Sequence, residues 1–197
     1  MKKKVVYFLP DNPIGDKAGN TTRCFQLLSY FYKNKEFVHV DFVSFLPWSD
    51  ASIAQFKALF PAFNLILIPK KGPKKTNYLK YFLVDKLPKL WRSIFGGRSS
   101  ISLVTPYIEK QLKNQLNNKR YDIALVSYAS WASLIQLIDA EYSIIDTHDF
   151  ITKQFIDREK NDSQHKIGRL FQQEINLLQN FNEVWSYSLE EHYIFEQ

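Results

Sequence analysis

Short apolar runs alternate with amphipathic segments along the whole chain. The first run, Lys3 to Leu9, is continuous and ends at Pro10, which is typical of a strand buried on both faces of a parallel sheet. From Thr21 the apolar positions are spaced as on one face of a helix. Five later segments have the composition and length of strands: 37–45, 64–69, 121–127, 142–146 and 183–187.

Capping residues predict where several helices begin. Ser49 precedes a helix that Pro61 stops, and Thr105-Pro106 places a cap and a first-turn proline before another. Ser188 and Glu191 have the spacing of a capping box. Further helices are predicted over 78–87, 131–138, 152–158 and a longer stretch from the polar break at 161–163 to Leu178.

This regular alternation predicts an α/β fold with a doubly wound, mostly parallel, Rossmann-like sheet. Residues 1–197 form one domain on this interpretation. The last predicted helix reaches Gln197 without a C-cap, and we expect a longer protein to continue from it.

Composition narrows the class of protein. The 197 residues are 45% hydrophobic and 16% aromatic, enough for a core without disulfides or metals. Cys24 is the only cysteine, which favours a reducing compartment, and we expect it to be buried in a helix. The apolar run after Met1 is too short for a signal peptide, and no run reaches the roughly 20 residues of a membrane span.

The net charge of +6 permits contact with anionic partners, and the excess lies in Lys2–Lys4 and in the stretch Lys70–Arg98. Cations alternate with large apolar residues in Lys70–Arg98, a pattern that indicates either a membrane-interface segment or a helix with a solvated basic rim. A basic α/β binding module for membrane or nucleic acid is therefore the alternative function. The chain lacks RNA-binding signatures, so no nucleic acid is expected as a partner.

Ligands of such sheets bind where strands end, and three strand ends carry unusual sequence. The loop after the first strand contains Gly15 and Gly19 but no dinucleotide or nucleoside-triphosphate fingerprint. The second is Asp146-Thr147-His148-Asp149, in which a carboxylate beside His148 has the groups needed for general-base catalysis. Its structural alternative is that Thr147 or Asp149 caps the next helix and His148 is merely exposed. The third, Ser186-Tyr187-Ser188, is explained by capping.

These segments occur in an order that resembles the N-terminal domain of GT-B glycosyltransferases of the retaining, family-four type. The resemblance runs from the glycine-containing loop through Asp146–Asp149 and Glu174 to Val184–Glu191, over essentially the whole chain. It implies that His148 and Asp149 are the candidate catalytic residues. The candidate residues for binding the acceptor and lining the cleft are Gly15, Gly19, Asn20, Arg23, Tyr128 and Ser188.

The resemblance also implies an activity. A hexosyltransferase-type enzyme would move a sugar from a nucleotide-sugar donor, its substrate, to a glycan or lipid-linked acceptor in polysaccharide or cell-envelope synthesis, with no metal or other cofactor. The donor would be held by a C-terminal domain that this chain lacks, so the chain alone should be inactive. Many relatives carry a histidine at the end of the fourth strand, where this chain has Ser127-Tyr128-Ala129-Ser130, so the role of that histidine does not transfer. Retaining enzymes of this type need little protein base. Cytoplasmic localisation, peripheral at the inner face of the membrane, follows as an expectation.

Overall fold

A computed structural model describes residues 2–14, 19–71, 82–83, 87, 101–158 and 164–195 of the chain. The strands are β1 (Lys3–Phe8), β2 (Val38–Leu46), β3 (Asn64–Pro69), β4 (Arg120–Ser127), β5 (Asp139–Asp146) and β6 (Glu183–Trp185). The helices are α1 (Gly19–Lys33), α2 (Asp50–Leu59), α5 (Pro106–Leu116), the 3₁₀ helix η2 (Ala129–Leu137), α6 (Ile151–Arg158), α7 (Gln164–Leu178) and α8 (Leu189–Phe195).

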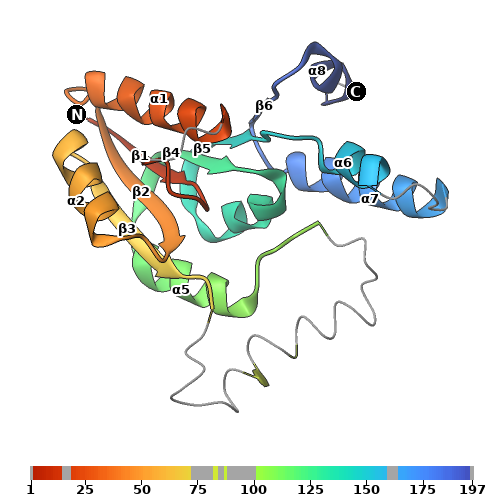
Figure 1. Ribbon diagram of the computed structural model, residues 1–197, viewed down its shortest axis with the longest axis horizontal. Coiled ribbons are helices and arrows are strands. Elements are labelled where there is room, and N and C mark those ends of the chain that lie inside the picture. The colour runs from red at the N-terminus through yellow and green to blue at the C-terminus, as the bar shows by residue number, and fades with distance from the viewer. Residues whose placement is uncertain are drawn as a thin grey trace.

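The described strands form one six-stranded sheet in the order β3-β2-β1-β4-β5-β6 (Figure 1). All of the pairings within it are parallel. The predicted Rossmann-like α/β class is therefore confirmed, and the sheet is wholly parallel among the described strands. The chain reverses its direction of winding between β1 and β4, and ligands of doubly wound sheets bind outside the carboxyl ends of the strands at such a point.

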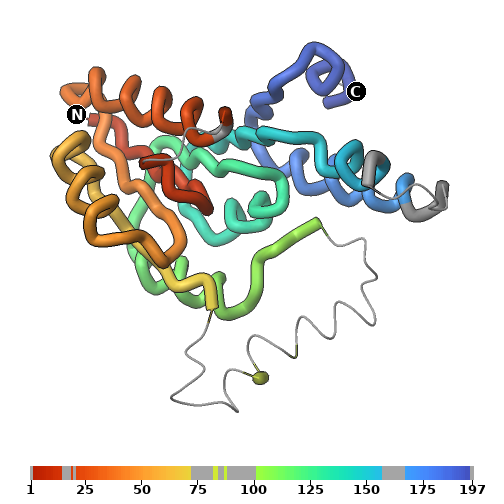
Figure 2. Tube along the Cα trace, viewed as in Figure 1, coloured from red at the N-terminus to blue at the C-terminus, as the bar shows by residue number. Residues whose placement is uncertain are grey.

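Both faces of the sheet are buried, which explains the continuous apolar run of the first strand. Val5 and Tyr7 pack with α1 and α2 on one face, whereas Val6 and Phe8 pack with α5 and η2 on the other. Figure 1 shows α1 and α5 on opposite sides of the sheet. The trace in Figure 2 places α8 at the end of the molecule away from α2.

Several predicted boundaries are confirmed. The Ser49 hydroxyl accepts a bond from Ser52 N at 3.1 Å, and Thr105 Oγ1 accepts one from Ile108 N at 3.4 Å, with Pro106 in the first turn. Half of the predicted capping box also forms: Ser188 Oγ accepts from Glu191 N at 3.1 Å, whereas the Glu191 carboxylate accepts from Tyr187 N at 3.1 Å. These short-range signals work because each cap satisfies amides that the helix itself leaves free.

Three predicted boundaries were wrong. β5 begins at Asp139, because the polar residues there pair with the start of β4. The predicted helix 131–138 is instead η2, which starts earlier because Trp131 N bonds to Tyr128 O in a 3₁₀ turn. β6 ends at Trp185, after which the chain turns into the α8 cap.

A buried carboxylate toward the amino ends of the strands has partners on both of its oxygens. Asp41 accepts bonds from Tyr121 Oη and Lys119 Nζ, each at 2.7 Å, and from Asn64 Nδ2 at 3.2 Å. Burial raises the pKa of Asp41, but the bonds from these three partners outweigh burial and bring it below its ordinary value. Asp41 is thus a satisfied structural charge.

The described part of the chain contains no helix long and apolar enough to cross a bilayer. Most of Lys70–Arg98 lies outside the described residues, as do the helix predicted over most of 78–87 and Gly15. Lys70 itself is described, and its ammonium lies over the rings of Phe45 at 5.5 Å and Trp131 at 5.4 Å.

Candidate functional site

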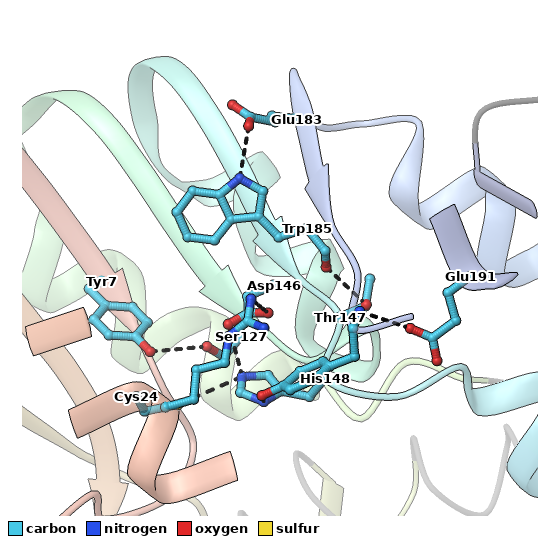
Figure 3. A network of polar contacts seen from close by, with 11 residues as sticks. Tyr7, Cys24, Ser127, Asp146, Thr147, His148, Glu183, Trp185 and Glu191 are labelled. Carbon is cyan, nitrogen blue, oxygen red and sulfur yellow. Dashed lines mark hydrogen bonds and ion pairs between the residues drawn. The ribbon is translucent and has the colours of Figure 1, made fainter. Parts of the chain in front are cut away.

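A polar cluster lies where the carboxyl ends of β4, β5 and β6 meet the first turns of α1 (Figure 3). β5 ends at Asp146 and leads into His148, Tyr128 follows β4, and Tyr187 follows β6. Arg23 reaches the cluster from α1. The parallel sheet brings these residues together because it aligns the carboxyl ends of neighbouring strands.

Asp146 is the buried centre of this cluster. Its side chain is 0% exposed, and Oδ1 accepts a bond from Arg23 Nη2 at 3.0 Å. Oδ2 makes no hydrogen bond to the described residues, although His148 Nε2 lies 3.3 Å away. Burial raises the pKa of Asp146 to about 6, and the Arg23 guanidinium opposes this only in part. Unlike Asp41, Asp146 is an incompletely satisfied charge.

His148 lies between Asp146 and Tyr187. Its side chain is 1% exposed, and burial, with a smaller contribution from Arg23, lowers its pKa to about 4. The ring is therefore neutral near pH 7. Tyr187 Oη lies 3.0 Å from Nδ1, and Cys24 Sγ lies 3.7 Å from Nε2. The tautomer of the neutral ring decides which atom donates in the contact between Nδ1 and the Tyr187 hydroxyl.

The backbone at His148 is held in an unusual conformation. Its φ is 60°, and Asp149 N donates to Thr147 O at 2.7 Å across it, which closes a γ-turn. Tyr128 also has a positive φ, 69°, and its amide donates to Asp146 O at 2.8 Å. The two rings stack with centroids 4.3 Å apart and planes 21° apart. Left-handed backbone at two ring-bearing residues is costly and persists where packing imposes it.

Arg23 connects α1 to the last strand. Its guanidinium lies 4.2 Å from the ring centroid of Tyr187, in addition to its ion pair with Asp146. Burial is the main cause that raises the pKa of Tyr187 to about 12. Tyr187 is thus a neutral phenol that contacts both Arg23 and His148.

Apolar packing closes the cluster on its inner side. Cys24 is buried as predicted, and burial raises the pKa of its thiol to about 11. Ser127 Oγ donates to Tyr7 Oη at 3.4 Å, and Figure 3 shows both residues beside Cys24. Cys24 is a protonated packing residue rather than a thiolate nucleophile.

Two pockets flank this cluster. The first, called the β4–β5 pocket, has a volume of about 380 Å³. It is lined by Ile101, Leu103, Tyr128, Ala129, Ser130, Thr147, Asp149, Ile151, Gln154, Phe155 and Leu170. The second, called the β6 pocket, has a volume of about 420 Å³. It is lined by Arg23, Val184, Trp185, Ser186, Tyr187, Ser188, Leu189 and His192.

His148 separates the two pockets and lines neither. One neighbour, Tyr128, belongs to the β4–β5 pocket, and the other, Tyr187, belongs to the β6 pocket. The His148 ring is therefore the middle of a wall of three rings.

The predicted site residues are divided among these places. Asp149 is exposed and lines the β4–β5 pocket with Tyr128, whereas Arg23 and Ser188 line the β6 pocket. Gly19 is the first residue of α1, and a Cβ there would meet no atom within 4 Å. Gly15 lies outside the described residues, and Asn20 belongs to α1 with a side chain outside them.

The structural alternatives for the Asp146–Asp149 strand end were wrong. His148 is buried rather than exposed. The first amides of α6 are capped from a distance, since Glu174 of α7 accepts bonds from Ile151 N and Thr152 N at 2.8 Å and from Thr152 Oγ1 at 2.7 Å. Neither Thr147 nor Asp149 is therefore required as a cap.

Sequence reasoning missed the carboxylate that contacts His148 and the role of Tyr187. The partner is Asp146, the last residue of an otherwise apolar strand end, and such a position is itself a signal of a buried charge. Tyr187 was overlooked because the capping motif around it already explained the sequence of this segment. Among the described residues no group of three or more His, Cys, Asp or Glu side chains is placed to hold a metal ion.

The fold and the position of the pockets define a class of protein: a doubly wound α/β domain whose pockets lie at the carboxyl ends of its strands. No protein-family profile and no curated protein sequence matches the chain. Among solved structures, the sucrose-phosphate synthase (tll1590) of Thermosynechococcus elongatus aligns with 99% of this chain at 13% identity and a TM-score of 0.56. The chain covers 45% of that protein, less than half of its length.

A second solved structure, LpCGTa in complex with UDP, aligns with 74% of this chain at 14% identity. The chain covers 30% of it, with a TM-score of 0.35. At 13% identity the first of these likenesses concerns the fold alone: the chain has the architecture of one half of a GT-B enzyme, as the sequence resemblance predicts.

Proposed function

We propose that this chain is the acceptor-binding domain of a glycosyltransferase that uses a nucleotide-sugar donor. The observation that carries the proposal is the alignment of nearly the whole chain with half of a sucrose-phosphate synthase, combined with two pockets at the carboxyl edge of the sheet. A GT-B half places its substrates at this edge. In the proposed reaction an acceptor hydroxyl forms the new glycosidic bond, the bond from the sugar to the donor phosphate breaks, and the hydroxyl proton leaves with the phosphate.

We assign different roles to the two candidate catalytic residues. Asp149 is exposed in the β4–β5 pocket and is available to contact an acceptor. His148 is enclosed, and its Nδ1 is occupied by Tyr187. Its proposed role is to position Tyr128 and Tyr187, the residues that separate the two pockets, rather than to accept a substrate proton.

Further parts of the proposal concern the rest of the protein. A C-terminal domain would hold the donor, and retention of configuration and a hexosyl donor follow from the family resemblance. The acceptor would be a glycan or a lipid-linked glycan in polysaccharide or cell-envelope synthesis. The protein would be cytoplasmic and peripheral at the inner face of the membrane, with Lys70–Arg98 on anionic lipid. Co-sedimentation with anionic vesicles at low salt tests this, and absence of binding would remove the membrane contact.

The function is tested on the product of the complete gene that encodes this chain. The purified protein is incubated with a panel of nucleotide-sugars and of glycan and lipid-linked acceptors, and released nucleoside diphosphate and glycosylated products are followed by mass spectrometry. We expect transfer by the complete product and none by the 197-residue chain. Absence of transfer and of donor hydrolysis across the panel would contradict the proposal.

A further inference from the structure

We propose that the β4–β5 pocket binds an uncharged pyranose ring of the acceptor, stacked on Tyr128 and hydrogen-bonded by Asp149, Gln154 and Ser130, and that it rejects phosphorylated sugars. The inference rests on the proposed function and adds the class of acceptor that this pocket recognises.

The volume of the pocket fits one ring with its substituents. At about 380 Å³ it lies at the small end of the range for ligand sites, and it is half-open rather than enclosed. Its walls come from four places in the chain: the segment after β4, the segment from β5 into α6, Leu170 of α7, and Ile101 with Leu103. A ring bound here is held at the carboxyl ends of β4 and β5.

Tyr128 provides a flat surface in fixed orientation. One face of its ring is covered by His148 at 4.3 Å, and the ring also lines the pocket. The positive φ of 69° and the bond from its amide to Asp146 O fix the backbone that carries it. A pyranose has an apolar face of C–H groups, which packs well against an aromatic ring whose position is set in advance.

Three polar side chains of the pocket are available to a ligand. Within the described part of the chain, Ser130, Asp149 and Gln154 make no side-chain hydrogen bond or ion pair, unlike Thr147, whose hydroxyl donates to Trp185 O. Together they offer a hydroxyl, a carboxylate and an amide. A carboxylate accepts bonds from two neighbouring hydroxyls, which is the pattern a sugar ring presents.

The charge of the pocket selects against anions. Among its described lining residues Asp149 carries the one charged side chain, and it is negative. Arg23, the cation of the site, lies in the β6 pocket and is paired with Asp146. A phosphate on a ring in the β4–β5 pocket would therefore meet a carboxylate, and the like charges repel.

The test is titration of the ¹⁵N-labelled 197-residue chain with methyl glucoside, methyl galactoside and methyl mannoside, and with the corresponding hexose 6-phosphates, followed by NMR. We expect at least one uncharged glycoside to shift the amides of Asp149, Ile151 and Gln154. The matching phosphate should bind at least about tenfold more weakly, the size of one strong polar contact.

Variants identify the groups responsible. Asp149→Asn should weaken glycoside binding about tenfold, and Asp149→Lys should reverse the preference in favour of the phosphates. Tyr128→Phe keeps the ring and should keep binding. Asp139→Asn, at the exposed other end of β5, is the matched control and should change nothing. The Asp149 side chain is exposed and makes no hydrogen bond or ion pair within the described part of the chain, so its variants should retain the wild-type spectrum.

Two results would overturn the inference: hexose phosphates that bind the pocket as tightly as the glycosides, or glycosides that shift only amides of the β6 pocket or none at all. The proposed function fails separately. Transfer by the complete gene product without glycoside binding here would leave the function standing and remove this assignment. Glycoside binding in this pocket without any transfer by the complete gene product would support the assignment of the pocket and contradict the proposed function.

Discussion

At the residue scale, the distinctive group is a buried carboxylate with one strong partner. Asp41 and Asp146 are both buried at strand positions, but Asp41 has partners on both oxygens and Asp146 depends on Arg23. This difference explains why the pKa of Asp41 is lowered and that of Asp146 is raised. It also makes Arg23 the residue whose loss the site tolerates least.

We predict that Arg23→Met lowers the free energy of unfolding by about 2 to 4 kcal/mol, because it leaves the Asp146 charge buried without a cation. The double variant with Asp146→Asn should lose less than the sum of the two single variants. Urea denaturation of the four proteins measures this coupling. Arg120→Met is the control, since its pair with Glu141 is exposed and should contribute nothing measurable. If the losses of the two single variants add, the ion pair between Arg23 and Asp146 does not stabilise the fold.

Within the polar cluster, the dependence of stability on pH follows from two opposing shifts. Folding lowers the pKa of His148 from 6.5 to about 4, so the unfolded chain binds a proton that the folded chain excludes, and stability falls as the pH falls through this window. Folding raises the pKa of Asp146 from 3.8 to about 6, so stability falls there as the pH rises. The two contributions largely cancel between these values. Asp41, with its lowered pKa, matters only at more acidic pH.

Asp146→Asn should therefore make stability fall more steeply with acid, because it removes the contribution that opposes His148. Urea midpoints of wild type and variant, measured from about pH 7 to about pH 4.5, test this. Parallel profiles of the two proteins would mean that folding does not raise the pKa of Asp146.

The sequence predicted where the site lies but not which residues meet there. The strand end 146–149 was recognisable because polar residues follow an apolar run. The pair Arg23 and Asp146 is separated by 123 residues, and His148 and Tyr187 by 39. Such contacts depend on sheet order and on the backbone at Tyr128 and His148, which no local pattern encodes.

At the element scale, α6 depends on α7 for its first turn. The carboxylate of Glu174 accepts three hydrogen bonds from the start of α6, and it is fully buried. Both helices contribute to the β4–β5 pocket, through Ile151, Phe155 and Leu170. By capping α6, Glu174 thus holds together two helices that line the β4–β5 pocket.

Glu174→Ala should lower the free energy of unfolding by about 2 to 3 kcal/mol, because it leaves the amides of Ile151 and Thr152 without an acceptor. Hydrogen exchange by NMR should show faster exchange in α6 and no change in α5. Glu190→Ala is the control, because the Glu190 side chain is 82% exposed. Uniform acceleration across all helices would instead indicate global destabilisation.

Elements with strong local signals were predicted well. β3 matches its predicted limits, and α2 and α5 begin at their predicted caps, because these features depend on neighbours in the chain. β5 and η2 differ from prediction because strand pairing and a left-handed residue, rather than hydrophobic pattern, set their limits. The long-range cap from Glu174 has no local signature.

At the scale of the whole molecule, the sheet is most protected at its centre. β1 has a strand on each side and is buried on both faces, whereas β6 is a three-residue edge strand that is partly exposed. Native-state hydrogen exchange should therefore be slowest in β1 and β4 and much faster in β6. Equal protection of β6 and β1 would mean that the edge near the β6 pocket is as rigid as the core.

The strand order has a consequence for the time at which the site forms. β2, β3, β4, β5 and β6 each join an existing edge of the sheet in the order in which they leave the ribosome. No strand has to be inserted between two others, so the sheet is able to grow during translation. The β4–β5 pocket is nearly complete once α7 emerges, but the Arg23–Tyr187 contact forms only after β6 and Tyr187 have emerged. A nascent chain would therefore acquire the β4–β5 pocket before the wall of three rings that separates it from the β6 pocket.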